Sequence, residues 1–447
     1  MGLLDFGFGL APLSGVIYVI ASSVYLLYFH PASKFPGSKF SAVSYVLYCS
    51  ASIHGRYPYP HSPNEVLFYT PQAAMDIYSP AVRNQELFVK TDLMDFGAGD
   101  LGFIWESDPA KRKAMAKKIL PAFSAKAIKE KEPLVHHQEL TKVKDGKTSD
   151  AVEMIRQSSF AGNLFQLSQE IPIIALAATS FVPLRVLRLI LAVLRANAAE
   201  VKARIDKRGK AKHRDFMDHT IEPEGPPPAT EKELVHVEQV TFQMFIASFD
   251  PVQITFHAVL SFTLKHPKTY AILTKEIRDA FATYDDMTPE TLTHLKHLHA
   301  FIYETLRFHL TTPTGMPHIS PGATVDGVYV PKVVVVQLSN FTATRHERHF
   351  ADPLDFRPER WLPSDHALYD KRYAGDNLEA FFPFSLGPRQ CSGQAIAWSQ
   401  TRMFLGKVLW TFDLEGVRGH EFSFDRDFSV HMLWNRPEVG PRFLPRR

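Results

Sequence analysis

Residues 384–393 read FSLGPRQCSG and contain one of the two cysteines in the chain. Glycines at 387 and 393 leave room around the Cys391 sulfur, because glycine has no Cβ and accepts unusual backbone angles. The residues that follow, AIAWSQTRMFLGKVLW, read as a helix, whose N-terminal dipole is expected to lower the pKa of the thiol. Such a loop suits a thiolate that binds ferric haem, with Arg389 placed to meet a haem propionate. The alternative interpretation is a buried thiol in a tight turn.

Two further segments precede this loop. Residues 304–307 read ETLR, and residues 356–361 read FRPERW. Alone, a Glu and an Arg three residues apart on a helix usually form a solvated surface contact. In this order ahead of the cysteine loop, the segments resemble the haem-thiolate cytochrome P-450 family, and the likeness runs from about Pro63 to the C-terminal strands. The resemblance implies a fold that is mainly α with small β-sheets, preceded by an N-terminal transmembrane helix.

The resemblance also implies roles for single residues. Cys391 matches the axial ligand of the iron of haem b, and Glu304, Arg307 and Arg360 match a salt-bridged trio that holds the proximal core. The implied cofactor-binding residues are Phe384, Gly387, Arg389, Cys391, Gly393, Arg112 and His318.

The expected helix that begins at Ser107-Asp108-Pro109 is strongly basic. Arg112 falls where the family often has a propionate-binding residue, whereas Ala116 stands where a second basic residue is common. Its lysines are Lys111, Lys113, Lys117 and Lys118. They could dock an acidic partner, the NADPH-cytochrome P-450 reductase that the resemblance implies, by electrostatic steering, or they could simply form the solvated face of the helix.

Residues 247–252 read ASFDPV, where the family carries A-G-x-[DE]-T-T on its long helix over the haem. In the family, the acid and the last threonine organise water and protons for cleaving dioxygen. Asp250 keeps the acid, which makes it a catalytic candidate beside Cys391. Val252 has no hydroxyl, so proton delivery must be arranged differently.

The proline at position 251 has a second consequence. Pro251 cannot donate a backbone hydrogen bond to Ala247, which predicts a kinked helix and a carbonyl that Ser248 or a water could use. A plain kink in a core helix is the alternative. Phe249 and Val252 are expected to line an apolar substrate pocket.

The N-terminal segment from Leu10 to Phe29 has twenty residues without a charge, enough for a helix of about 30 Å that spans one bilayer core. A cleaved signal peptide is the rival interpretation. Asp5 precedes the segment, and Lys34 and Lys39 follow it, which predicts a cytosolic body. We therefore expect a membrane anchor in residues 1–30, a single haem-thiolate domain in residues 31–447, and location at the endoplasmic reticulum membrane.

The composition excludes several other classes. The 447 residues carry 50 Lys and Arg against 47 Asp and Glu, which leaves no basic surface of the kind that nucleic acid requires. Two cysteines cannot build a disulfide framework. The sequence contains no GxSxG, HExxH or GxxxxGK[ST], and the GxGxxG match at 97–102 meets a proline too soon to open a dinucleotide-binding helix.

The body is expected to be mainly helical, with strand-like alternation confined to short stretches such as Val325 to Leu338. Thr230 and Glu233 have capping-box spacing and mark a second helix start. The apolar stretch from Ile171 to Leu194 contains Pro183 and two arginines, which favours a buried or interfacial helix over a second span.

Three functions remain open. The favoured one is a monooxygenase that oxidises an apolar small molecule, such as a secondary-metabolite intermediate, with dioxygen and electrons from NADPH through the reductase. The second is a haem-thiolate isomerase, dehydratase or peroxide-using enzyme, which Val252 would suit. The third is a degenerate haem-binding protein, because the stretch from Ser124 to Phe160 is short for the family's helices; a faulty gene model would look the same.

Overall fold

The computed structural model describes residues 4–44, 64–79, 88–91, 99–130, 184–210, 216–416, 430–431, 433–434 and 441–446. Its α-helices are α1 (Leu4–Tyr28), α2 (Lys39–Val43), α4 (Pro71–Tyr78), α5 (Pro109–Ile119), α9 (Leu184–Asp206), α10 (Glu231–Lys265), α11 (Pro267–Ala280), α12 (Lys296–Phe308), α13 (Asn340–Ala343) and α14 (Gln394–Thr411). Short 3-10 helices are η2 (Leu120–Phe123), η4 (Phe216–His219), η5 (Thr291–His294), η6 (Pro358–Trp361), η7 (Lys371–Tyr373), η8 (Leu378–Ala380) and η9 (Gly387–Arg389).

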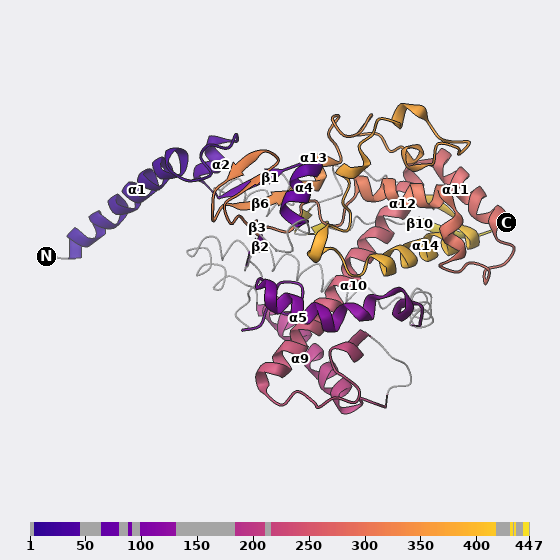
Figure 1. The fold of residues 1–447 in the computed structure, drawn as a ribbon, viewed down its shortest axis with the longest axis horizontal. Helices are drawn as coiled ribbons and strands as arrows, with labels where there is room; N and C mark the ends of the chain where they lie inside the picture. The colour runs from indigo at the N-terminus through magenta and orange to yellow at the C-terminus, as the bar shows by residue number, and fades with distance from the viewer. Residues whose placement is uncertain are drawn as a thin grey trace.

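The longest described helix, α10, organises the body. Its 35 residues span about 52 Å, and Figure 1 shows it running from α5 and α9 toward α11, α12 and α14. At its N-terminal half, Val240 packs with Phe103 and Ile119. At its C-terminal half, Phe256 stacks on Phe404 of α14 with ring centroids 4.0 Å apart. The helix therefore ties the two halves of the body together.

The main hydrophobic core lies among α10, α11, α12 and α14. Phe262 of α10 is buried and stacks on Phe356 with ring centroids 4.8 Å apart, and Phe301 of α12 meets the same ring edge-on. Burial of large side chains of this kind contributes about 1.5–3 kcal/mol each. This core is the platform on which α14 and the cysteine loop are held.

The strands form small sheets, as predicted. They are β1 (Glu65–Phe68), β2 (Val89–Lys90), β3 (His318–Ile319), β4 (Ala323–Val325), β5 (Val328–Val330), β6 (Val335–Leu338), β7 (Phe412–Gly416), β8 (Val430–His431), β9 (Leu433–Trp434) and β10 (Pro441–Pro445). One sheet has four strands in the order β1-β6-β3-β2, with β1 parallel to β6, and the pairs β4-β5, β7-β10 and β8-β9 are antiparallel. The predicted strand stretch 325–338 is divided among β4, β5 and β6.

Both predicted helix starts are confirmed. The Asp108 side chain accepts hydrogen bonds from the backbone N–H groups of Ala110 and Lys111 and caps α5. At the start of α10, the Thr230 hydroxyl accepts from the Glu233 backbone N–H, and the Glu233 carboxylate accepts from the Thr230 N–H. Each such cap stabilises its helix by about 1 kcal/mol.

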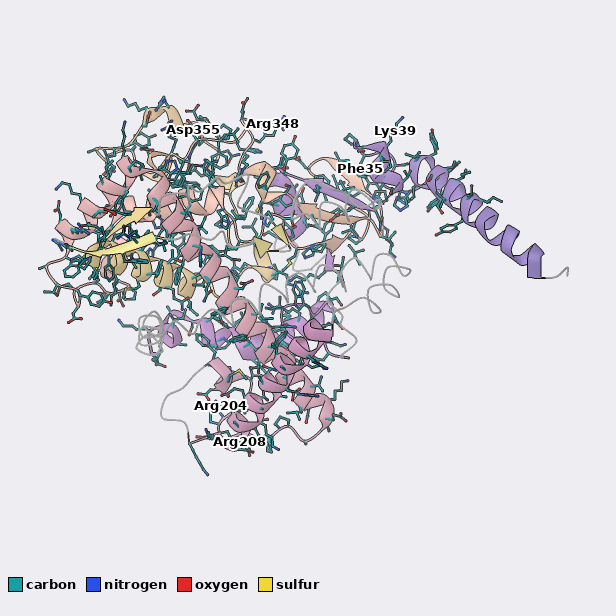
Figure 2. All side chains as sticks on the ribbon, turned by 180° about the vertical axis from the view of Figure 1, so that it is seen from behind. Phe35, Lys39, Arg204, Arg208, Arg348 and Asp355 are labelled. Carbon is teal, nitrogen blue, oxygen red and sulfur yellow. The ribbon has the colours of Figure 1, made fainter. Side chains whose placement is uncertain are left out.

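The N-terminal helix begins at Leu4, six residues before the predicted Leu10, and ends at Tyr28. It projects from the body in Figure 1, and Lys39 lies where it joins the body in Figure 2. Its side chains from Val16 to Ile20 are more than half exposed. Among the described residues, α10 is the one helix long and apolar enough to cross a membrane, and much of it is buried inside the body; the segment Val16–Tyr28 of α1 is a shorter apolar helix.

Several predictions fall outside the described residues: the short stretch 131–160, the apolar residues 171–183, and Gly97 and Ala98 of the glycine motif. The described part of that motif, 99–102, precedes no helix directly. Instead, the Gln243 side chain of α10 donates to the Leu101 carbonyl and accepts from the Ile104 N–H, which fixes the loop against α10. The rejection of a dinucleotide-binding loop agrees with this geometry.

Candidate functional site

Cys391 lies between η9 and the start of α14. Its backbone N–H donates to the Phe384 carbonyl at 2.8 Å, which closes the loop, and the Gln390 N–H donates to Gly387 at 3.1 Å. The side chain is exposed and lines a cavity of about 580 Å³, within the usual size of cofactor and ligand pockets. The residue as a whole is thus exposed at a cavity, although its sulfur is partly shielded from water.

Gly387 lets this loop approach α4 closely. Its φ is +67°, and a Cβ at this position would lie 2.0 Å from the backbone oxygen of Tyr78. The Tyr78 hydroxyl in turn donates to the Met316 carbonyl at 3.1 Å and accepts from the Leu338 N–H at 3.0 Å. The cysteine loop, α4 and the four-stranded sheet are thus packed together through Gly387 and Tyr78.

We expect Gly387→Ala to misplace the loop, because both its backbone angle and the Tyr78 oxygen exclude a Cβ. The predicted result is a loss of several kcal/mol in unfolding free energy, of the order of a backbone clash and strain together. Urea unfolding measures it. Gly375→Ala is the matched control, since no atom lies within 4 Å of the Cβ it would introduce. Equal losses in the two variants would contradict the packing argument.

The pKa of Cys391 differs from the expectation. Burial raises the pKa of the thiol above its ordinary value, and the backbone N–H of Gly393 lowers it only in part. The start of α14 therefore does not by itself make a thiolate, and the expected lowering is wrong. A metal cation bound at the sulfur would have to lower the pKa further, because metal ligation requires a deprotonated thiol.

The predicted trio is fully buried and closely paired. The Glu304 carboxylate accepts from Arg307 at 2.8 and 2.9 Å and from Arg360 at 3.3 Å. Burial raises the pKa of Glu304, but the charges of the two arginines outweigh it and hold the pKa below its usual value. Arg307 also donates to the Thr344, Pro353 and Asp355 carbonyls.

Sequence reasoning missed a member of this network. The Trp361 indole N–H donates to Glu304 at 2.8 Å. The FRPERW segment was noted for its arginine alone, although the tryptophan follows that arginine directly.

Three basic side chains, the buried Lys90 and His318 and the half-buried Arg389, gather near the cysteine loop. His318 is buried, and its ring lies near enough to Lys90 and Arg389 for both positive charges to lower its pKa. Lys90 of β2 and His318 of β3 lie opposite each other in the antiparallel strand register. The Lys90 ammonium donates to the Ile104 carbonyl, and the Arg389 guanidinium donates to the Glu106 carbonyl at 2.7 Å. Lys90 was missed, because a two-residue strand gives no sequence pattern.

Arg112 is also buried, with its guanidinium 3.5 Å from the centre of the Phe103 ring. The four lysines of α5 are exposed, and Ala116 is half-buried beside Phe103. The structure thus brings His318 and Arg389 together and places the lysines on the surface.

Buried histidines should make the protein sensitive to mild acid. Burial is the main reason that the pKa of His297 is lowered to about 4 and those of His309 and His318 to about 3. The unfolded chain binds these protons near pH 6.5, so stability should be constant above that pH and fall below it, by at most about 1.4 kcal/mol per pH unit for each histidine. Urea unfolding between pH 7 and 5 measures the slope. A flat profile would contradict the assignment of neutral buried rings.

In the middle of α10, Asp250 is buried, while Phe249 and Val252 are half-buried. Pro251 lies inside a continuous helix. The Ser248 hydroxyl donates to the Phe245 carbonyl at 3.1 Å, not to Ala247, which corrects the expected use of the freed acceptor. The Pro251 carbonyl accepts from the Thr255 hydroxyl at 2.9 Å. Phe249 stacks on Phe245 with ring centroids 6.0 Å apart.

The residues present fit a haem held through sulfur. The Cys391 side chain faces a cavity, and Gly393 leaves the sulfur uncrowded at 3.9 Å from its notional Cβ. Buried Lys90 and half-buried Arg389 provide positive charge for an acidic cofactor edge, and the neutral ring of His318 lies beside them. These features match what a haem-thiolate protein requires.

Comparison with known proteins agrees. The family model for cytochrome P450 matches residues 135–437. The chain is similar to cytochrome P450 monooxygenase TwmD of Talaromyces wortmannii, with 36% identity over 97% of this chain and 95% of the relative. It is also similar to cytochrome P450 monooxygenase poxC of Penicillium oxalicum, with 30% identity over 96% of this chain and 92% of the relative. The chain belongs to the cytochrome P450 family and is a monooxygenase of that family.

Proposed function

We propose that this P450 oxidises an apolar small molecule, in keeping with a secondary-metabolite pathway, and that Cys391 is the axial ligand of haem b. The observation that carries the proposal is the Cys391 side chain opening onto a cavity directly after the Gly387 turn and before α14. A haem bound there would supply the activation of dioxygen. Arg389, His318 and Lys90 would bind its propionates, and Arg112 remains a further candidate.

The trio beneath the site has a positioning role in this proposal. Glu304, Arg307 and Arg360 hold α12 against η6 and the segment 344–357, and α12 packs on α14. Phe384, Gly387 and Gly393 give the loop its shape. These contacts hold the loop that carries the sulfur.

Above the site, Asp250 is proposed to hold and move protons, and Phe249 and Val252 to contact the apolar substrate. The absence of a hydroxyl at Val252 supports a second candidate, a haem-thiolate isomerase, dehydratase or peroxide-using enzyme that needs no such donor.

Electrons are proposed to come from NADPH-cytochrome P-450 reductase, steered by the exposed lysines of α5. The apolar, exposed α1 is proposed to anchor residues 31–447 at the cytosolic face of the endoplasmic reticulum membrane.

The test supplies apolar candidate substrates to the haem-loaded protein in two ways. NADPH, reductase and dioxygen should give an oxidised product. Product from an organic peroxide alone would favour the second candidate, and haem uptake without product by either route would contradict the proposal.

Val252→Thr tests the missing hydroxyl. A threonine would restore a donor one turn after Ser248, so peroxide release per NADPH should fall several-fold and product yield should rise. Val252→Ala, which adds no hydroxyl, is the matched control. Unchanged peroxide release in Val252→Thr would show that the proton route does not need this position.

A further inference from the structure

Arg402 of α14 is a cation that no carboxylate neutralises in the described part of the chain. Its guanidinium donates to Nδ1 of His299 at 3.1 Å and lies 4.8 Å from the ring centre of Trp398. Its Nε is buried and has no hydrogen-bond partner among the described residues. A partly buried guanidinium is normally paired with an acid, because an unpaired buried charge is costly.

The neighbours of Arg402 are neutral. Burial and the charge of Arg402 lower the pKa of His299 to about 4, so the ring is an uncharged acceptor at neutral pH. On α12, Tyr303 also faces Arg402 closely enough for each to influence the other's pKa. Lys296, the other charged group that acts on His299, is positive as well. None of the groups that act on Arg402 or on His299 in the described part of the chain is therefore an acid.

Arg402 lines the same cavity as Cys391, but at a distance along α14. It lies eight residues after Gln394, the first residue of α14, which is about 12 Å of helix. The described residues that line the cavity include no acid, and its uncharged polar side chains are Ser124, Gln390, Ser392 and Gln394. The Lys90, His318 and Arg389 group, by contrast, belongs to the sheet side of the loop. The cavity is large enough for more than a single water, at about 580 Å³.

We propose that this end of the cavity is a binding site for a small oxyanion, a free carboxylate or phosphate, which Arg402 recognises by a charge-assisted hydrogen bond through its unused donors. The polar side chains along the wall complete the contacts. The site goes beyond the proposed oxidation, and it does not depend on the identity of the haem ligand.

The test uses the purified haem-loaded protein, so the carboxylates of its own cofactor are already in place. Thermal unfolding is followed in sodium phosphate, in sodium acetate, and in sodium chloride at equal ionic strength. A bound anion raises the midpoint as its concentration passes the dissociation constant. We expect phosphate or acetate to raise it above the chloride value, and the responding anion identifies the group that binds.

Arg402→Gln is the main variant, because its amide can still donate to His299 while the charge is lost. The affinity for the anion should fall at least about tenfold, the low end of the loss of a charged hydrogen bond. Arg402→Lys should keep part of the response. The matched control is Arg372→Gln, since Arg372 is exposed and already paired with Asp370.

Tyr303→Glu provides a second, opposite test. It places a tethered carboxylate beside Arg402, which should abolish the response to free anions while leaving Arg402 in place. If this variant does not fold, Arg402→Gln and Arg402→Lys still decide the matter. The proposal is overturned if neither phosphate nor acetate raises the unfolding midpoint of the native protein above its value in chloride, or if Arg402→Gln shows the same rise. It is also overturned if poly-glutamate alone raises the midpoint, which would assign the acid to a protein partner. A missing thiolate spectrum would overturn the haem assignment instead.

Discussion

Cys391→Ala is expected to abolish monooxygenase turnover and the carbon monoxide absorption band typical of thiolate ligation in the ferrous protein. The alanine has no atom that can donate charge to the iron, and among the described residues no other cysteine is present to replace the sulfur. The fold should survive, because the residue is exposed as a whole and the substitution removes a single sulfur atom. Reduced-minus-oxidised spectra with carbon monoxide, together with product analysis, measure the effect.

The second cysteine of the chain provides the control. Cys49→Ala should keep both the band and the turnover. Circular dichroism of Cys391→Ala should match the native protein, which separates loss of the ligand from loss of the fold. A thiolate band that persists in Cys391→Ala would refute the assignment of the ligand.

Glu304→Gln is expected to destabilise the protein by about 3–5 kcal/mol, the usual cost of removing one partner from a buried ion pair. Glutamine is nearly the same size, but it leaves the charges of Arg307 and Arg360, both fully buried, without their shared carboxylate. The Arg357 backbone N–H and the Trp361 indole would also lose a charged acceptor. Urea unfolding followed by tryptophan fluorescence and by circular dichroism measures the change.

An exposed pair sets the scale for this comparison. Lys275 and Asp279 are more than half exposed on α11, so Asp279→Asn should cost less than about 1 kcal/mol. A Glu304→Gln protein as stable as Asp279→Asn would show that the buried trio does not hold the fold. Because the pKa of Glu304 is lowered in the folded protein, the ionised carboxylate should stabilise the fold fully above about pH 4.5, the ordinary value. This stabilisation should be lost as the pH falls through the lowered value.

The sequence was sufficient for features that local chemistry decides. Asp108 before Pro109, and Thr230 with Glu233, mark helix starts because capping depends on residues three or four positions apart. The Glu304 and Arg307 pair has helical spacing, but on its own this spacing indicates a surface contact, and its role was inferred only through the family resemblance. The same holds for the second arginine of the trio, Arg360, which is 56 residues distant from Glu304.

Features that depend on tertiary packing could not be predicted in this way. Lys90 and His318 meet through a two-residue strand pairing, and Tyr78 reaches Gly387 across more than 300 residues of chain. The pKa of Cys391 was misjudged because the dipole of α14 is local, whereas the burial that opposes it comes from the surrounding fold. The unneutralised charge of Arg402 appears only when the residues facing it from α12 are known.

The contact of Gly387 with Tyr78 also limits how this loop can be redesigned. The obstacle to a larger residue at position 387 is a main-chain oxygen, so no side-chain exchange at position 78 can make room for it. A second-site suppressor of a Gly387 variant would have to shift or shorten the backbone around Tyr78 and Ser79. Laboratory evolution of a P450 with this architecture should therefore leave the glycine untouched while neighbouring side chains vary.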